Sequence, residues 1–193
     1  MNYIWLFICW LGYFIIHSVF ALHQVKKLFY SLGLNTASYR LVFNIFALLL
    51  LIPIFVYSSS FQSENIFPIT NISKFTGLLL AGWGIFIVKL AFKSYDTKAF
   101  LGLGSMEKEQ EFHTDGLLQY VRHPLYSGSI LLLLGYFFFN PTISSGISVG
   151  MMILYFVVGI QFEERKLIKT FGEKYIEYKK KTPMLIPRFW NSI

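Results

Sequence analysis

The chain changes from polar to apolar at the stretch Tyr120-Val121-Arg122-His123-Pro124-Leu125-Tyr126-Ser127-Gly128. Because proline needs no backbone N–H partner at the first helical position, Pro124 predicts the start of a helix. On that helix His123, Tyr126 and Ser127 fall at i, i+3 and i+4, so they share one face. A cation, an imidazole and a phenol therefore meet at one end of an apolar run that continues to Phe139.

These residues alone leave two interpretations of the stretch open. Unsatisfied N–H groups in the first helical turn make the place suitable for an anionic group of a ligand. Alternatively, Arg122 and His123 face lipid headgroups, with Tyr126 in the aromatic belt of the membrane interface. In either case Gly128 leaves room for the close approach of a neighbouring helix.

The composition is typical of a polytopic membrane protein. Of 193 residues, 55% are hydrophobic and 19% aromatic, which is too apolar for a soluble domain of this size. The formal net charge is +7, but the basic residues lie in loops and near the C-terminus, so no nucleic-acid partner is expected. The single cysteine, Cys9, lies in an apolar run without a partner for a disulfide or a metal site.

The apolar segments predict an all-α integral membrane bundle of five transmembrane helices, in one domain over residues 1–193. The predicted spans are Tyr3–Leu22, Leu41–Tyr57, Phe75–Phe92, Leu125–Phe139 and Ile147–Phe162. Residues 1–115 hold the first three spans and a long polar loop, and residues 116–193 hold the last two spans and a polar tail. We expect His23–Arg40 and Ser58–Lys74 to be loops.

Small residues and a short turn predict how some spans pack. Gly77, Ala81 and Gly84 give the third span a stripe suited to close helix packing. Asn140-Pro141 makes a tight, uncharged turn between the last two spans. These two spans are therefore expected to form an antiparallel hairpin whose outer ends lie on one side of the membrane.

The segment after the last span has the pattern of a basic amphipathic helix. One predicted face, at steps of four, three, four and three, consists of Glu164, Ile168, Phe171, Tyr175 and Tyr178. We expect a helix that continues without a break from the span and lies at the membrane surface or on the bundle. Glu163 and Glu164 should then lie at the same membrane depth as Arg122 and His123.

The distribution of Lys and Arg predicts the orientation. Successive loops carry three, one, several and no such residues, and the tail carries eight. This pattern places the N-terminus outside, and the loop 93–119 and the tail in the cytosol. The acidic residues of that loop are more typical of a solvated loop than of a metal site, and they include Asp96, Glu107, Glu109 and Glu111.

His17 is an imidazole inside the first predicted span. Such a residue is costly in a membrane and is often functional. The alternative is an interfacial histidine bonded to a backbone carbonyl group.

Residues 122–128 resemble the Arg-His-Pro-x-Tyr-x-Gly motif of the isoprenylcysteine carboxyl methyltransferase family, whose relatives include the phospholipid N-methyltransferases. The second half of that signature follows as Glu163-Glu164-x-x-Leu167, Phe171-Gly172-x-x-Tyr175-x-x-Tyr178, Pro183 and Ile186-Pro187. Both blocks occur in order, separated by one hairpin, and cover about Gly116–Phe189. In the other half, His17-Ser18, Ala21, Lys26 and Tyr39-Arg40 look like a bacterial branch that includes methanethiol S-methyltransferases.

The resemblance implies a membrane methyltransferase that uses S-adenosyl-L-methionine and needs no metal. The implied cofactor-binding residues are His123, Tyr126, Gly128, Glu163 and Glu164. Arg122 and Glu163 are the implied catalytic residues, and His17 and Arg122 are the implied substrate-binding residues. The methyl acceptor would be a lipophilic molecule, or a small thiol or carboxylate, that arrives from the bilayer. The expected location is a bacterial inner membrane, with the mouth of the site in the cytosol.

Two other functions stay open. Sterol-type NADPH-dependent membrane reductases carry a similar Arg-His-Pro signature, but usually with Asn after the proline, where this chain has Leu125. The second alternative is a non-catalytic membrane protein of the same fold. Binding of adenosylmethionine rather than NADPH separates the first alternative from a methyltransferase.

Overall fold

The computed structural model describes residues 2–93, 102–103 and 112–188, and it confirms the all-α fold. The helices are α1 (Asn2–Ala21), α2 (His23–Ser31), α3 (Thr36–Ser59), α4 (Asn71–Phe92), the 3₁₀ turn η1 (Gly116–Gln119), α6 (Pro124–Phe139), α7 (Ile143–Phe171) and α8 (Glu173–Lys181). The acidic loop residues Asp96, Glu107, Glu109 and Glu111 lie outside the described residues, so their predicted solvation stays a prediction.

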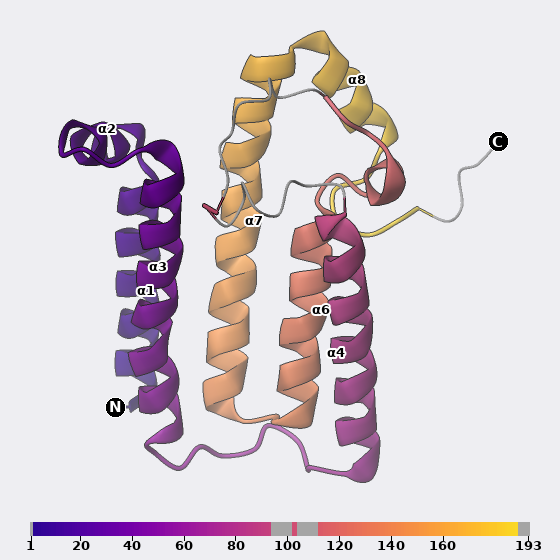
Figure 1. Cartoon of the computed structure of the whole chain (residues 1–193). Coiled ribbons are helices and arrows are strands. Elements are labelled where there is room, and N and C mark those ends of the chain that lie inside the picture. Colours follow the sequence, from indigo (N-terminus) through magenta and orange to yellow (C-terminus); the bar gives the residue numbers. More distant parts are fainter. Residues whose placement is uncertain (1, 94–101, 104–111, 189–193) are drawn as a thin grey trace.

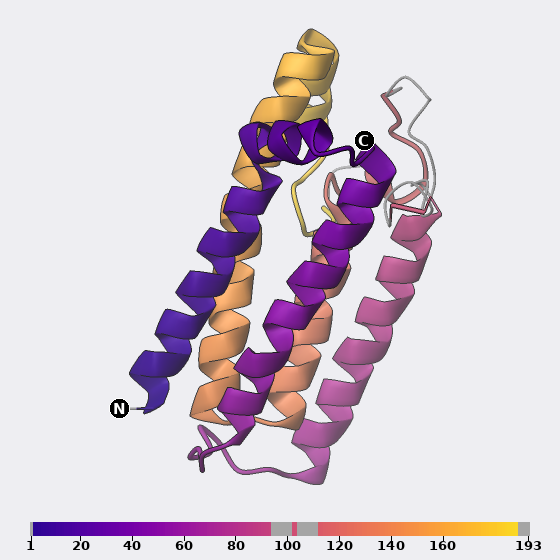
Figure 2. The same ribbon diagram turned by 60° about the vertical axis from the view of Figure 1, so that its left-hand side comes forward.

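The helices α1, α3, α4, α6 and α7 run side by side along one axis, and α2 and α8 lie at the same end of this bundle, above different helices (Figure 1). Contacts link α4 to α6, α6 to α7, α7 to α1, and α1 to α3. Figure 2 shows the same bundle with α1 and α3 turned forward. Helix α7 therefore joins the N-terminal pair of helices to the pair α4 and α6.

The apolar surface of the bundle identifies a multi-pass membrane protein. Within the described residues, α1, α3, α4 and α7 are each long and apolar enough to cross a membrane. Their side chains are largely exposed, as at Leu48 (64%) and Phe75 (63%), which suits lipid rather than water. Helix α6 has 16 residues, so it is about 24 Å long, against a hydrocarbon core of about 30 Å.

Glycines bring α4 and α6 into close contact, as the small-residue stripe predicted. A Cβ atom added to Gly84 would lie 2.7 Å from the carbonyl oxygen of Gly128. One added to Gly77 would lie 2.7 Å from the carbonyl oxygen of Gly135. The two backbones thus touch along the helices, and α4 supports the helix that begins at Pro124.

The predicted hairpin of α6 and α7 is confirmed. The segment that connects α3 to α4 is hydrogen-bonded to the turn between α6 and α7. The backbone N–H of Ile66 donates to the carbonyl of Pro141 at 2.7 Å, and that of Ile143 donates to Glu64 at 2.9 Å. The hydroxyl of Thr142 caps α7 by accepting from Ser145. Both outer ends of the hairpin consequently lie at the end of the bundle that carries α2 and α8 (Figure 1).

Two predictions about helices were wrong. Residues His23–Arg40 are not a loop, because His23–Ser31 form α2 and α3 already begins at Thr36. The segment after the last span is not one unbroken helix, because α7 continues to Phe171 and the chain turns at Gly172. Gly172 has φ of +60°, a conformation that glycine adopts without the steric cost of a side chain.

The contact between α1 and α7 contains polar side chains. The indole Nε1 of Trp10 donates to the Ser148 hydroxyl at 3.0 Å, and both residues are buried. About two turns further along, His17 Nδ1 lies 2.7 Å from the hydroxyl of Tyr155. These bonds fix α1 against α7 inside an apolar surrounding, where alternative partners are scarce.

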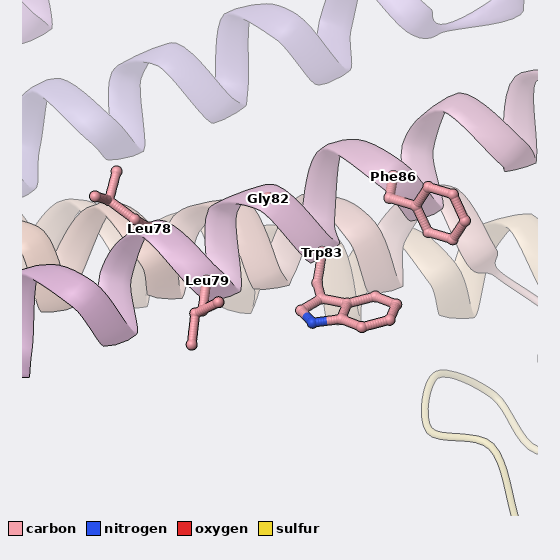
Figure 3. Close-up of a pocket in the computed structure, with 5 residues that line it drawn as sticks. All are labelled: Leu78, Leu79, Gly82, Trp83 and Phe86. Carbon is pink, nitrogen blue, oxygen red and sulfur yellow. The ribbon is translucent and has the colours of Figure 1, made fainter.

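A shallow apolar hollow lies on the face of α4 that points away from α6 (Figure 3). It is lined by Leu78, Leu79, Gly82, Trp83 and Phe86. Its lining is carried by one helix and holds no ionisable side chain, so it is a lipid-facing surface and not the place for chemistry.

Candidate active site

The two signature blocks meet at the end of the bundle where α8 lies. The imidazole Nε2 of His123, just before α6, lies 3.3 Å from Oε1 of Glu164 on α7. These residues are 41 positions apart in the sequence. The predicted hairpin explains their contact, because α6 leads away from His123 and α7 returns to the same depth.

His123 and Glu164 are both buried, at 4% and 2% exposure. Burial lowers the pKa of His123 despite the neighbouring carboxylates of Glu163 and Glu164. The imidazole is therefore neutral near pH 7, and Nε2–H donates a hydrogen bond to the Glu164 carboxylate rather than forming an ion pair.

Arg122 is the principal cationic partner of Glu164. Its Nε and Nη2 atoms both lie 2.7 Å from Oε1 of the carboxylate. Its Nη1 donates to the carbonyl of Lys179 at 3.1 Å and to the carbonyl of Thr182. One guanidinium thus binds the buried carboxylate and the end of α8 together, which orders Glu164 from two sides.

Sequence reasoning missed Lys179. Its ammonium group lies 2.6 Å from Oε2 of Glu164, the oxygen that Arg122 leaves free. Tyr175 and Lys179 share one face of α8 at i and i+4, and Thr182 follows directly after the helix. The sequence signal for this face was Gly172, because a glycine there can end one helix and allow a second to begin.

The segment after α8 runs along the motif that begins the site. The backbone N–H groups of Arg122 and His123 donate to the carbonyls of Pro183 (2.9 Å) and Met184 (3.1 Å). The hydroxyl of Ser127 donates to the carbonyl of Leu185 at 2.7 Å. The signature prolines follow α8 directly, so they end that helix and lead the chain back over the site.

Aromatic side chains cover the other side of the cluster. The ring of Phe112 lies 5.2 to 6.1 Å from the rings of Phe171, Tyr175 and Tyr178. The hydroxyl of Tyr178 donates to the carbonyl of Leu118 at 2.6 Å. These contacts confirm that the face from Glu164 to Tyr178 points into the molecule, although it is divided between α7 and α8.

Tyr175 carries an unsatisfied polar atom beside the charged cluster. The residue is 2% exposed, and its hydroxyl has no hydrogen-bond partner within the described part of the chain. Burial raises the pKa of Tyr175, and the Glu164 carboxylate raises it further. A buried hydroxyl without a partner is costly, so this hydroxyl is a candidate contact for a bound molecule.

The remaining predicted residues lie at different places around this cluster. Tyr126 packs on His123 and on Phe156 of α7, one turn deeper in the bundle. Gly128 faces Gly84 and Val88 of α4, so the structure gives it a packing role. Glu163 is exposed beside Glu164.

His17 is not part of this cluster. Its partner Tyr155 precedes Glu164 by nine residues on α7, which is about 14 Å along the helix axis. The ring of His17 also lies 4.9 Å from that of Phe43 on α3. His17 is thus a polar residue between α1, α3 and α7. It bonds to a tyrosine hydroxyl, not to a backbone carbonyl as expected for an interfacial histidine.

A matched pair of tyrosine variants tests the unsatisfied hydroxyl. Tyr175→Phe removes a buried hydroxyl without a partner, so the free energy of unfolding should rise by about 1 kcal/mol. Tyr178→Phe removes a hydroxyl that donates to Leu118, so the same quantity should fall by about 1 kcal/mol. Thermal unfolding in detergent measures both, and a loss of stability in Tyr175→Phe would show that its hydroxyl is satisfied.

The chemistry of the cluster suits a ligand that carries an ammonium group. A buried carboxylate with an exchangeable cationic partner matches an ammonium group, and a free phenol hydroxyl matches a polar ligand atom. No group of three His, Cys, Asp or Glu side chains that could hold a metal ion occurs within the described ranges.

One known protein family matches the part of the chain that holds Arg122, His123 and Glu164. The phospholipid methyltransferase family matches residues 72–174, which span nearly all of α4, the motif at Arg122 and His123, and the whole of α7. The chain belongs to the phospholipid methyltransferase family.

The similar proteins include methyltransferases of two kinds, one acting on methanethiol and one on isoprenylcysteine by name. A methanethiol S-methyltransferase of Crocosphaera subtropica is 34% identical over 121 residues, covering 58% of this chain and 46% of that protein. Protein-S-isoprenylcysteine O-methyltransferase B of Arabidopsis thaliana is 32% identical over 84 residues, covering 42% of each chain. The chain spans about half the length of these relatives or less, and no solved structure matches it.

Proposed function

We propose that this protein is an S-adenosyl-L-methionine-dependent membrane methyltransferase. The observation that carries the proposal is the buried Glu164 carboxylate, held by Arg122 and His123 of the methyltransferase motif. When bound, the cofactor would supply a methyl group on a sulfonium sulfur; the acceptor atom would attack the methyl carbon in line, the carbon–sulfur bond would break, and adenosylhomocysteine would leave with the electron pair on sulfur. Family membership favours this chemistry over the NADPH-dependent reductase.

The described residues divide into binding and positioning roles. Glu164 binds the ammonium group of the cofactor, and His123, Tyr126 and Glu163 line the same site. Arg122 keeps Glu164 in place, because its donors are already directed at that carboxylate and at the carbonyls of Lys179 and Thr182. The aromatic cover of Phe112 and Tyr175 excludes water, which strengthens electrostatic interactions inside the site.

We propose a small thiol as the first acceptor to test. The matches to methanethiol S-methyltransferases reach 58% of the chain, whereas the match to the Arabidopsis isoprenylcysteine enzyme reaches 42%. A lipophilic carboxylate, as on a prenylated cysteine, is the second candidate. Glu163, exposed next to the cluster, is the candidate catalytic carboxylate, and His17 is the candidate contact for an acceptor that enters from the bilayer.

Calorimetric titration of adenosylhomocysteine into the purified protein in detergent tests cofactor binding. Methanethiol and a prenylated cysteine are then supplied with labelled adenosylmethionine, and label in the acceptor is measured. The expected result is saturable binding and transfer to a thiol. Binding of NADPH without binding of adenosylhomocysteine would contradict the proposal.

We further propose five membrane crossings, with the short helix α6 as the fourth, in a bacterial inner membrane. The connections at the end of the bundle with α2 and α8 carry most of the Lys and Arg residues, so that end is cytosolic. A reporter fused after Ile193 should therefore be cytosolic, and one inserted near Asn65 should be external. Finding both reporters on one side would contradict five crossings.

A further inference from the structure

The two oxygens of the Glu164 carboxylate have partners of different kinds. Oε1 accepts from Arg122 and His123, whose side chains are 8% and 4% exposed. Oε2 binds the ammonium group of Lys179, whose side chain is 41% exposed. One oxygen is thus held by buried groups, and the other by a group that reaches into solvent.

Lys179 can leave without disturbing the backbone around it. Its carbonyl accepts from Nη1 of Arg122 at 3.1 Å, so this bond fixes the main chain of α8 whatever the side chain does. Lysine carries its charge on a flexible stem of four carbons, and an ammonium group is strongly hydrated. Rotation of the stem would place the ammonium of Lys179 fully in water.

The charges of the cluster require such a departure if a cationic ligand binds. Arg122 and Lys179 provide two positive charges against the one buried carboxylate, and the exposed Glu163 lies beside them. A further ammonium group at Oε2 would meet a like charge at the same oxygen, because Lys179 already lies 2.6 Å from it. Like charges at such a distance repel, most strongly where water is excluded.

We propose that Lys179 is a displaceable counter-ion, whose ammonium occupies the position at Glu164 Oε2 that the ammonium group of the ligand takes on binding. This inference rests on the proposed function, in which the ligand is adenosylmethionine. Lys179 therefore competes with the ligand and lowers its affinity, while it keeps Glu164 paired in the empty protein. The buried hydroxyl of Tyr175 beside the same carboxylate is a second sign that a ligand completes the cluster.

The test compares Lys179→Gln with the unmodified protein by calorimetric titration of adenosylhomocysteine. Because the ligand no longer displaces an ion pair, Lys179→Gln should bind it about threefold to tenfold more tightly. Lys180→Gln is the matched control, since it removes the same charge from the neighbouring exposed position. It should leave the affinity unchanged within about twofold, because exposed charges are screened by salt.

A second ligand isolates the ammonium group. 5′-Methylthioadenosine keeps the nucleoside and the thioether but lacks the amino acid, so it should bind both proteins equally. Unchanged or weaker binding of adenosylhomocysteine to Lys179→Gln would overturn the inference, as would an equal gain for methylthioadenosine. If neither protein binds adenosylhomocysteine, the proposed function itself fails. Lys179→Met, which keeps an unbranched stem without charge, gives the same comparison if Lys179→Gln does not fold.

Discussion

Gly84→Ala and Gly135→Ala should each lower the free energy of unfolding by about 1–3 kcal/mol, the cost of overpacking a tight contact. The new Cβ atom at Gly84 would lie 2.7 Å from the carbonyl oxygen of Gly128, and the one at Gly135 would lie 2.7 Å from the backbone N of Ala81. Backbone atoms cannot rotate away as a flexible side chain can. The two helices must therefore separate, and thermal unfolding in detergent measures the loss.

Gly82→Ala is the matched control on the same helix. Nothing lies within 4 Å of a Cβ atom at this position, which forms part of the apolar hollow in Figure 3. Alanine also has a helix propensity about 1 kcal/mol better than glycine, so stability should stay equal or rise. An equal loss in all three variants would mean that glycine itself, and not the α4–α6 contact, is needed in these helices.

The bundle could be predicted from the sequence because hydropathy and small residues act locally. Apolar runs identified the spans, and the spacing of Gly77, Ala81 and Gly84 identified the face that contacts α6. The short turn at Asn140-Pro141 predicted the hairpin, and with it the contact between the ends of α6 and α7. Each inference needed only residues adjacent in the sequence or on one helix face.

The two wrong predictions, of a loop at His23–Arg40 and of one unbroken helix after the last span, also have local causes. Helix α2 is short and polar, and none of its residues is buried, so its sequence has no apolar run to distinguish it from a loop. The face from Glu164 to Tyr178 keeps a helical period across Gly172, although the chain turns there at a φ of +60°. Periodicity cannot report such a turn, because two helices packed on one site can continue the same face.

Part of the site depends on that turn, which Gly172 could have signalled but whose direction the sequence does not give. The direction of α8 after Gly172 decides which of its lysines reaches Glu164, and Lys179 does so while Lys180 remains exposed. The same geometry changes the interpretation of Arg122. From the sequence this residue was a catalytic and substrate-binding candidate, whereas its guanidinium is directed at Glu164 and at the carbonyls that end α8.

Glu164→Gln should have the largest effect on stability and on cofactor binding together. The carboxylate is 3% exposed and neutralises Arg122, which is 8% exposed, so its removal leaves a buried cation without a counter-charge. Breaking a buried ion pair in this way costs about 3–5 kcal/mol. Thermal unfolding and calorimetric titration of adenosylhomocysteine, the latter well below the melting temperature, measure the two effects.

The loss of affinity in Glu164→Gln has a separate cause, because the neutral amide cannot make a charge-assisted bond to the ligand's ammonium group. Such a bond contributes about 1.5–3 kcal/mol, so the affinity should fall roughly tenfold or more. Glu163→Gln controls for the lost charge: Glu163 is exposed and adjacent, so the stability of this variant should stay within about 0.5 kcal/mol of the unmodified protein.

A double variant tests whether the stability effect comes from the unpaired cation. Arg122→Met combined with Glu164→Gln removes both charges, so it should be less destabilised than the sum of the two single variants. The measured coupling then belongs to the ion pair that joins the two signature blocks. Simple additivity would instead mean that the two side chains are not coupled, with Arg122 satisfied by the carbonyls of Lys179 and Thr182 and Glu164 by Lys179 and His123.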